Sequence, residues 1–139
     1  MAAVDTNVII RYLVGDDTEQ AEAARVLLDA FSPEEPAFIC REVMLEVAWV
    51  LERSYHFTRS QVAEALMDLT ASDSLTVENS DDVAAAAHFY RQHGVGFSDL
   101  MVLSAAERAG ATPLYTFDRR LARMEGVELV GGKAGSTSQ

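Results

Sequence analysis

Short apolar segments that alternate with longer helical ones constrain the fold of this chain most strongly. Five segments have the length and residue types of strands: 2–4, 37–40, 75–78, 113–117 and 127–130. Helical spacing or helix start and stop signals mark the stretches between them: 7–14, 18–31, 41–55, 58–71, 80–93 and 98–109, with a helical turn at 118–124. Among these signals, Thr18 can cap helix 18–31, and Thr58 with Gln61 forms a capping box for helix 58–71. Strands that alternate with helices pair in parallel through right-handed crossovers. The sequence therefore predicts an α/β fold in which helices cover both faces of a parallel sheet.

The length of the chain fits one folded unit. Its 139 residues match the size of a typical domain, and 49% of them are hydrophobic, which is enough for a sizeable core. We expect a single domain over residues 1–130. From Gly131 onward the chain is rich in Gly, Ser and Thr, so residues 131–139 are expected to form a flexible tail.

Composition excludes several settings for this protein. No apolar run approaches the roughly 20 residues that span a bilayer, and the first residues lack the basic and apolar segments of a secretory signal. The single cysteine, Cys40, has no partner within the chain for a disulfide. We therefore expect no membrane association and a reducing, cytoplasmic location.

The net charge of −11 argues against a protein that holds nucleic acid on a broad basic surface. Any contact with nucleic acid must then be local. Ten of the eleven basic residues are arginines, so phosphate recognition would fall to guanidinium groups. An acidic cluster that binds divalent cations explains part of the imbalance, and so does ordinary solubility.

Two aspartates follow directly on predicted strands. Asp5 comes after residues 2–4, and Asp118 comes after residues 113–117. In open α/β sheets the carboxyl ends of the strands form the edge where ligands bind. Thr6 and Asn7 follow Asp5 and can cap the next helix or hold water and the outer shell of a metal. Each aspartate taken alone is equally explained as a helix N-cap.

Two further acids lie on predicted helices. Glu46 borders the apolar arc of helix 41–55, so its carboxylate can point into a cleft, although a solvated glutamate on the helix flank fits as well. Asp99 lies in the first turn of helix 98–109, where an aspartate also interacts favourably with the helix dipole. Taken together with the two strand-end aspartates, these acids predict a carboxylate cluster at one edge of the sheet.

Hard oxygen ligands of this kind suit Mg²⁺ or Mn²⁺, and the three histidines show no spacing typical of zinc sites. A divalent ion held by carboxylates supports phosphodiester hydrolysis because it activates water and stabilises charge on phosphate oxygens. Ser98 and Thr116 lie beside the acids and are candidates to orient the attacking water, with capping as the alternative role. Candidate phosphate contacts, each also explained as an ordinary surface residue, are Arg11, Arg119, Arg120 and Arg123.

The sequence resembles the PIN-domain ribonucleases, in particular the toxin component of VapBC-type toxin–antitoxin systems. The resemblance runs to about Val130 and rests on four segments in order: Val4-Asp5-Thr6-Asn7-Val8, the stretch 45–51 around Glu46, Phe97-Ser98-Asp99-Leu100, and Thr116-Phe117-Asp118. It implies a three-layer α/β/α sandwich with a five-stranded parallel sheet. The family's four acids match Asp5, Glu46, Asp99 and Asp118, which would bind Mg²⁺ or Mn²⁺, and its supporting polar positions match Asn7 or Thr116.

The resemblance also implies a function and partners. Such proteins cleave RNA as endonucleases, commonly form homodimers, and as toxins are inhibited by a cognate antitoxin whose tail enters the active-site groove. Two alternatives remain at this point: a phosphoacceptor receiver domain with a Mg²⁺-binding acidic pocket, and a catalytically silent interaction module with the same fold. The receiver chemistry calls for a lysine near the acids, whereas the only lysine is Lys133 near the end of the chain.

Overall fold

Helices and short parallel strands make up a computed structural model of the chain, which describes residues 1–131. The strands are β1 (Ala2–Ala3), β2 (Ala37–Ile39), β3 (Leu75–Val77), β4 (Leu114–Thr116) and β5 (Val127–Leu129). The helices are α1 (Thr6–Val14), α2 (Thr18–Asp29), α3 (Arg41–Arg53), α4 (Arg59–Ala71), α5 (Ser80–Gln92), α6 (Phe97–Arg108) and the 3₁₀ turn η1 (Leu121–Arg123). The predicted α/β class is confirmed. Apart from Gly131, the predicted tail lies outside the described residues.

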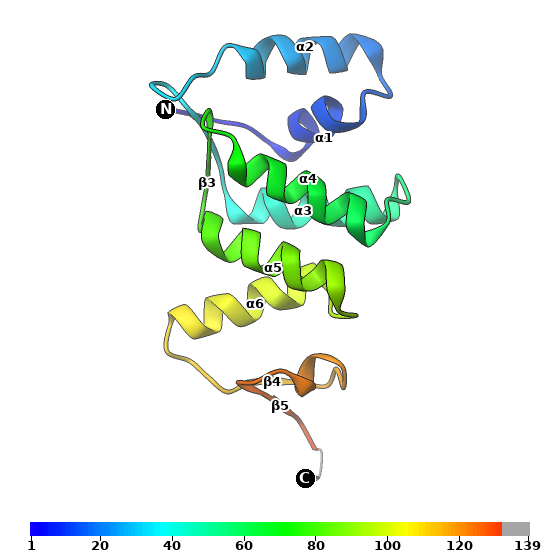
Figure 1. Cartoon of the computed structure of the whole chain (residues 1–139), viewed down its shortest axis with the longest axis vertical. Helices are drawn as coiled ribbons and strands as arrows, with labels where there is room; N and C mark the ends of the chain where they lie inside the picture. The colour runs from blue at the N-terminus through cyan, green and yellow to red at the C-terminus, as the bar shows by residue number, and fades with distance from the viewer. Residues whose placement is uncertain (132–139) are drawn as a thin grey trace.

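The strands form two separate parallel sheets. The first has the order β1-β2-β3, with Ala2 opposite Ala37, and the second pairs β4 with β5. The expectation of one five-stranded sheet inside a three-layer sandwich is therefore wrong for the described residues. Strand β1 is an edge strand of the first sheet and pairs only two residues with β2, whereas β4 pairs with β5. Figure 1 shows α1 and α2 at one end of an elongated molecule, β4 and β5 at the other, and α3 to α6 between them.

Local capping explains where several helices begin. Thr58 and Gln61 form the predicted capping box at the start of α4, and their reciprocal bonds are 2.8 and 3.1 Å long. The expectation that Thr18 caps α2 is wrong, because Asp17 accepts the Gln20 N–H at 3.0 Å and Thr18 is the first helical residue. Helix α6 likewise begins at Phe97, one residue before the predicted start.

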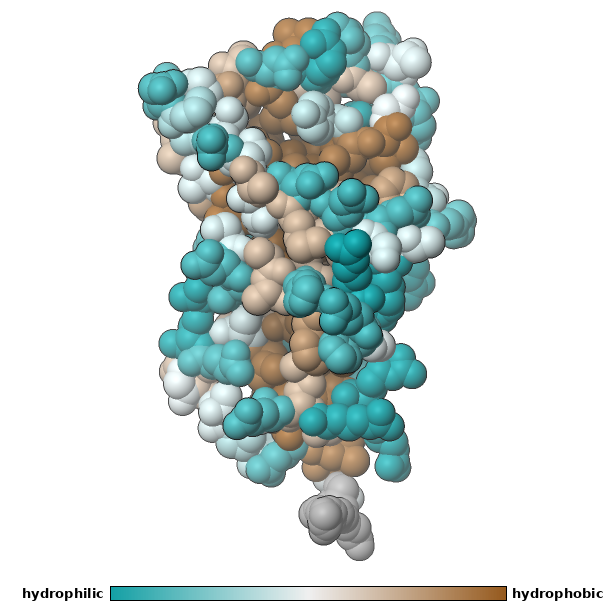
Figure 2. Space-filling model, viewed as in Figure 1, coloured by the Kyte–Doolittle hydropathy of each residue, from teal (hydrophilic) through white to brown (hydrophobic). Residues whose placement is uncertain are grey.

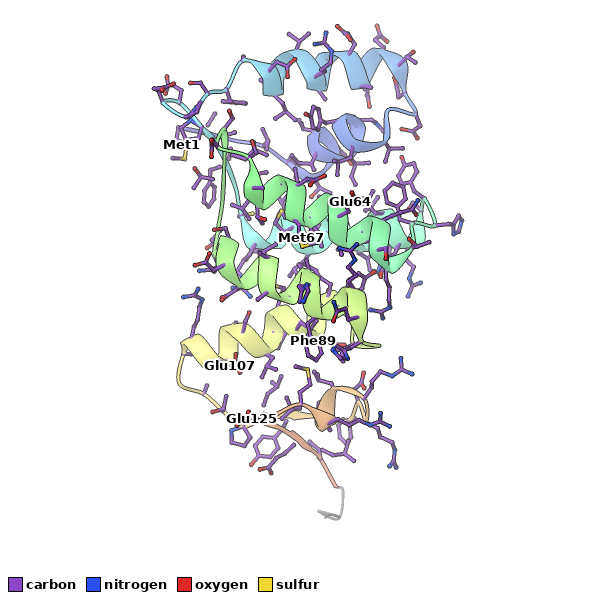
Figure 3. The ribbon with its side chains drawn as sticks, viewed as in Figure 1. Met1, Glu64, Met67, Phe89, Glu107 and Glu125 are labelled. Carbon is purple, nitrogen blue, oxygen red and sulfur yellow. The ribbon has the colours of Figure 1, made fainter. Side chains whose placement is uncertain are left out.

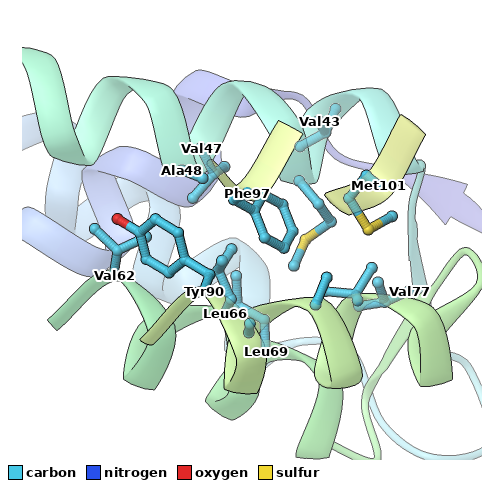
Figure 4. Close-up of a cluster of buried hydrophobic side chains, with 14 of the residues drawn as sticks. Val43, Val47, Ala48, Val62, Leu66, Leu69, Val77, Tyr90, Phe97 and Met101 are labelled. Atoms are coloured by element: carbon cyan, nitrogen blue, oxygen red, sulfur yellow. The ribbon is translucent and has the colours of Figure 1, made fainter. Parts of the chain in front are cut away.

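One apolar cluster runs through the molecule from Val4 to Val127. At its centre α3, α4, α5 and α6 bury side chains such as Met44, Leu66, Tyr90 and Met101 (Figure 4). The surface is mixed: Figure 2 shows polar residues over most of one face, with hydrophobic surface near α2. Among the described residues no helix is both long and apolar enough to cross a membrane.

Candidate functional site

Asp5 is held at the junction of β1 and α1. The N–H of buried Val4 donates to the Phe38 carbonyl at 3.1 Å, which fixes the chain beside β2 just before Asp5. Asp5 is the extended N-cap of α1, and its Oδ1 accepts the Thr6 N–H at 2.7 Å. The capping interpretation is therefore confirmed, and it engages one carboxylate oxygen. Because Asp5 is exposed, its carboxylate remains open to a ligand.

Glu46 faces the same junction from α3. The hydroxyl of Thr6, a residue only 8% exposed, donates to Glu46 Oε1 at 2.5 Å. Thr6 was expected to cap α1 or to hold water, but here its side chain connects the start of α1 to α3. This bond orients the Glu46 carboxylate toward the end of β1. Glu46 lines a pocket, and it is also exposed, as a glutamate on a helix flank would be.

A pocket of about 540 Å³ opens at this junction. It is lined by Asp5, Thr6, Asn7, Leu45, Glu46, Trp49, Val50 and Ser98. Trp49 lies off the main apolar arc of its helix, and the sequence predicts that it packs against the following helix, with an interface as the alternative. In the structure Trp49 is 55% exposed and forms part of the pocket wall, a place that no sequence signal indicated.

Asp99 lies in the first turn of α6, directly after Ser98. The N-cap of this helix is Gly96, and a Cβ atom placed on Gly96 would lie 3.2 Å from Asp99 Oδ2. Burial raises the pKa of the Asp99 carboxyl, and the negative charge of Asp118 raises it further. The two aspartates are thus close enough for their charges to interact.

Asp118 forms a tight turn after β4. Its Oδ1 accepts the backbone N–H groups of Arg120 and Leu121 at 2.8 and 3.0 Å, and its own N–H donates to Thr116 Oγ1 at 3.0 Å. Asp118 therefore binds the backbone of the turn that leads into η1, although the residue directly before η1 is Arg120. The Thr116 hydroxyl oxygen supports the same turn, which fixes where the Asp118 carboxylate lies.

The structure therefore brings the four predicted acids together in two pairs. Asp5 and Glu46 share the pocket, whereas Asp99 and Asp118 interact at the start of α6, and Ser98 links the two pairs because it lines the pocket beside Asp99. Within residues 1–131, no group of three or more His, Cys, Asp or Glu side chains converges as a metal cluster.

The donor atoms of the pocket nevertheless fit Mg²⁺ or Mn²⁺. All its polar side chains are carboxylates, hydroxyls or a carboxamide, which supply hard oxygen ligands. Mg²⁺ in nucleotide-processing sites uses one or two carboxylates and completes its shell with water and phosphate oxygens. Asp5 and Glu46 meet that requirement.

Two of the predicted phosphate-binding arginines have other partners. Arg11 donates to Gln20 at 2.6 Å and to Asp16 and Tyr55 at 3.2 Å, and Arg120 donates to the Gly94 carbonyl at 2.9 Å. Arg119 and Arg123 are exposed near Asp118 in the sequence. Arg120 is exposed as well, but its guanidinium already donates to the loop between α5 and α6.

Comparisons with known proteins identify the family of the chain. Residues 2–127 match the sequence profile of the PIN domain. The chain is also 24% identical over 125 residues to a VapC ribonuclease of Aquifex aeolicus (strain VF5). The aligned region covers 89% of this chain and 92% of that protein. Because the profile spans nearly the whole described chain, the chain belongs to the PIN domain family.

Proposed function

We propose that this protein is a Mg²⁺- or Mn²⁺-dependent endoribonuclease that hydrolyses RNA phosphodiester bonds. The observation that carries the proposal is the oxygen-lined pocket shared by Asp5, Glu46 and Ser98. The family match and the relative named VapC ribonuclease support the same activity. Because the chain belongs to the PIN domain family, we no longer consider a phosphoacceptor receiver domain as an alternative.

In this proposal Asp5 and Glu46 hold the metal ion, and Asn7 and Ser98 orient its bound water or a phosphate oxygen. The bound ion would lower the pKa of water and stabilise charge on the phosphate. Thr6 keeps the Glu46 carboxylate turned toward Asp5. Asp99 and Asp118, the remaining acids that match the family's pattern, would supply further carboxylates to the metal from the neighbouring rim.

Asp99 is the least exposed of the four acids. Partial burial and the charge of Asp118 raise the pKa of its carboxyl, so a divalent cation bound there would relieve the repulsion between the two carboxylates. Asp118 is fixed by two backbone N–H donors, and Thr116 is bound to the same turn. Asp118 thereby holds a negative charge beside Asp99 in a constant position.

RNA is the proposed substrate, and its contacts are local. In a chain of net charge −11 the exposed Arg119 and Arg123 beside the Asp118 turn are the proposed phosphate contacts. Arg11 and Arg120 are no longer assigned this role because both guanidinium groups already bind protein atoms.

We further propose that the enzyme is the toxin of a type II toxin–antitoxin pair. The named relative supports this assignment, and the proposed partners are a cognate antitoxin and a second copy of the chain. The exposed Trp49 in the pocket wall offers an apolar surface beside the acids, where an antitoxin segment would block access. Growth arrest on expression, relieved by the product of a neighbouring small reading frame, tests the pairing, and the mass in solution tests the dimer.

The ribonuclease activity is tested by sequencing the 5′ ends of total cellular RNA after incubation with Mn²⁺. Wild type is compared with Asp99→Asn and with Asp68→Asn, a control that neutralises an exposed aspartate on α4. Discrete cuts made by wild type and Asp68→Asn, but not by Asp99→Asn, are the expected result. Equal cutting by all three proteins contradicts the assignment of Asp99.

A second candidate function rests on the separation of the acids. Since three carboxylates do not converge among the described residues, a catalytically silent interaction module is the alternative. It predicts that wild type leaves the electron paramagnetic resonance signal of free Mn²⁺ unchanged. Loss of that signal on addition of protein supports the nuclease.

A further inference from the structure

The loop between α5 and α6, residues 93–96, leads directly into the helix that carries Asp99. Two of its four residues are glycines, and Gly96 is the N-cap of α6. The carbonyl groups at the end of α5 and in this loop need hydrogen-bond donors, because a helix end leaves its last carbonyls without partners. Two arginines from distant parts of the chain supply those donors.

Arg59, the first residue of α4, binds this loop. Its Nη1 donates to the backbone carbonyls of Tyr90, His93 and Val95 at 2.8, 3.1 and 3.0 Å. An arginine near a helix C-terminus also interacts favourably with the helix dipole. Arg59 thereby ties the end of α5 and the following loop to the capped first turn of α4.

The Arg59 guanidinium also lies over the ring of Tyr90, 4.3 Å from its centroid. Tyr90 is 1% exposed in the core beside Phe97 (Figure 4), and its hydroxyl donates to the carboxylate of Glu52. Glu52 belongs to α3, the helix that carries Glu46. A continuous chain of contacts therefore runs from α3 through Tyr90 and Arg59 to the loop before Asp99.

The same loop is held from its other side by Arg120, two residues after Asp118. Arg120 Nη1 donates to the Gly94 carbonyl at 2.9 Å, and a Cβ atom on Gly94 would lie 2.9 Å from this nitrogen. A side chain at position 94 would therefore displace the guanidinium. Next to this point Phe89, labelled in Figure 3, stacks on His93 with ring centroids 4.1 Å apart.

We propose that Arg59 is a positioning residue that sets Asp99 relative to Glu46 and Asp118, with Tyr90 and Arg120 as its partners. This inference rests on the proposed function. Within residues 1–131 the Arg59 guanidinium contacts the loop carbonyls and the Tyr90 ring, and none of the four acids. It therefore acts on Asp99 through the loop. Loss of the Arg59 guanidinium should therefore displace Asp99 and weaken Mn²⁺ binding. This weakening should exceed any effect of a lower folding stability.

The test compares Mn²⁺ dissociation constants, measured from the resonance signal of free Mn²⁺, for wild type and Arg59→Met. Methionine keeps much of the chain length but removes the donors and the charge. We expect about tenfold weaker binding, as for other residues that orient metal ligands indirectly. Arg59→Lys, which retains charge and donors, should recover part of the loss. Arg25→Met is the matched control, because Arg25 binds Glu22 and Asp29 on its own helix.

A double-mutant cycle separates positioning from general destabilisation. If Arg59 acts through Asp99, Arg59→Met in an Asp99→Asn background should weaken Mn²⁺ binding no further. Equal affinity of wild type and Arg59→Met, or an additive loss in the double variant, overturns the inference.

If Arg59→Met does not fold, Arg120→Met replaces it, because the exposed Arg120 holds the same loop through Gly94 alone. The double-mutant cycle then combines Arg120→Met with Asp99→Asn. Unchanged Mn²⁺ affinity in Arg120→Met, or an additive loss in the double variant, overturns the inference. Failure of wild type itself to bind Mn²⁺ has a different meaning, since it contradicts the proposed function and the inference with it.

Discussion

The two pairs of acids in this protein are held in different ways. Asp5 is the N-cap of the packed helix α1 and Glu46 lies on α3, and Thr6 connects them because its N–H donates to Asp5 Oδ1 and its hydroxyl donates to Glu46 Oε1. Asp99 lies in the first turn of α6, directly after a loop in which Arg120 binds the Gly94 carbonyl. Asp118 lies in a turn whose backbone N–H groups it binds itself. Helix packing fixes the first pair, whereas hydrogen bonds to loop backbone fix the second. The first pair should therefore be sensitive to changes in side-chain chemistry and the second to changes in loop geometry.

The largest expected effect comes from removing charge from the first pair. Asp5→Asn and Glu46→Gln should each lower RNA cleavage with Mn²⁺ by at least about 100-fold, because the proposed ion loses one of its two pocket carboxylates. Asp118→Asn should cost about tenfold, since the amide oxygen still accepts the two N–H groups of the turn. Initial cleavage rates test this order.

Glu64→Gln is the control for Glu46→Gln. Glu64 lies exposed on α4 (Figure 3), so its change should leave the rate unaltered. A larger loss in Asp118→Asn than in Glu46→Gln would reverse the roles given to the two pairs.

The next effect concerns Thr6, which orients Glu46. Thr6→Val keeps the shape of the side chain but removes the hydroxyl, so Mn²⁺ binding should weaken about tenfold. The control is Thr70→Val, which removes a hydroxyl that donates to the Met67 carbonyl within α4, away from the site. Its Mn²⁺ affinity should match that of wild type. Unchanged Mn²⁺ affinity in Thr6→Val would show that Glu46 needs no such support.

The sequence predicted the individual elements better than their arrangement. Helical spacing and the Thr58 capping box are local signals, and they placed α3 and α4 with small errors at their ends. The pairing of strands depends on contacts between distant segments. A two-residue strand such as β1 offers few backbone bonds to decide its neighbours, and the split into two sheets was not predicted.

The same distinction holds for the site. Asp5 and Glu46 were predicted to meet because each lies at a recognisable position, a strand end and the border of an apolar helix face. The contacts of Arg59 were not predicted, since they join residues 31 to 36 positions apart without a sequence signal. Exposed Trp49 was missed for a related reason: its exposure depends on which helices pack against α3.

A smaller effect is expected from Gly96→Ala in the loop before Asp99. Gly96 has φ −70° and ψ 147°, which alanine also adopts, so the backbone conformation tolerates the substitution. Its Cβ would lie 3.2 Å from Asp99 Oδ2 and push the carboxylate aside by a few tenths of an ångström. Cleavage should then fall about threefold, because small displacements of catalytic groups are costly. A folded variant with the activity of wild type would show that Asp99 tolerates such movement.

The smallest effect is on stability in the absence of metal. Burial and the charge of Asp118 raise the pKa of Asp99 in the folded protein, so the folded state binds this proton more tightly than the unfolded state does. The corresponding stabilisation is complete below the unfolded pKa and is lost as the pH rises through the folded pKa. Ionised Asp99 is therefore unfavourable at neutral pH, and Asp99→Asn should be more stable there by a few tenths of a kcal/mol.

Urea unfolding in EDTA at pH 7 and near pH 4 measures this difference, which should shrink at the lower pH as Asp99 takes up its proton. Asp73→Asn, at an exposed position outside the site, controls for the loss of one negative charge. In Asp118→Asn the gain from Asp99→Asn should become smaller, because one of the two causes of the raised pKa is removed. If the gain is unchanged in that background, burial alone raises the pKa of Asp99. The second pair would then be two separate carboxylates, without the charge repulsion that a bound cation would relieve.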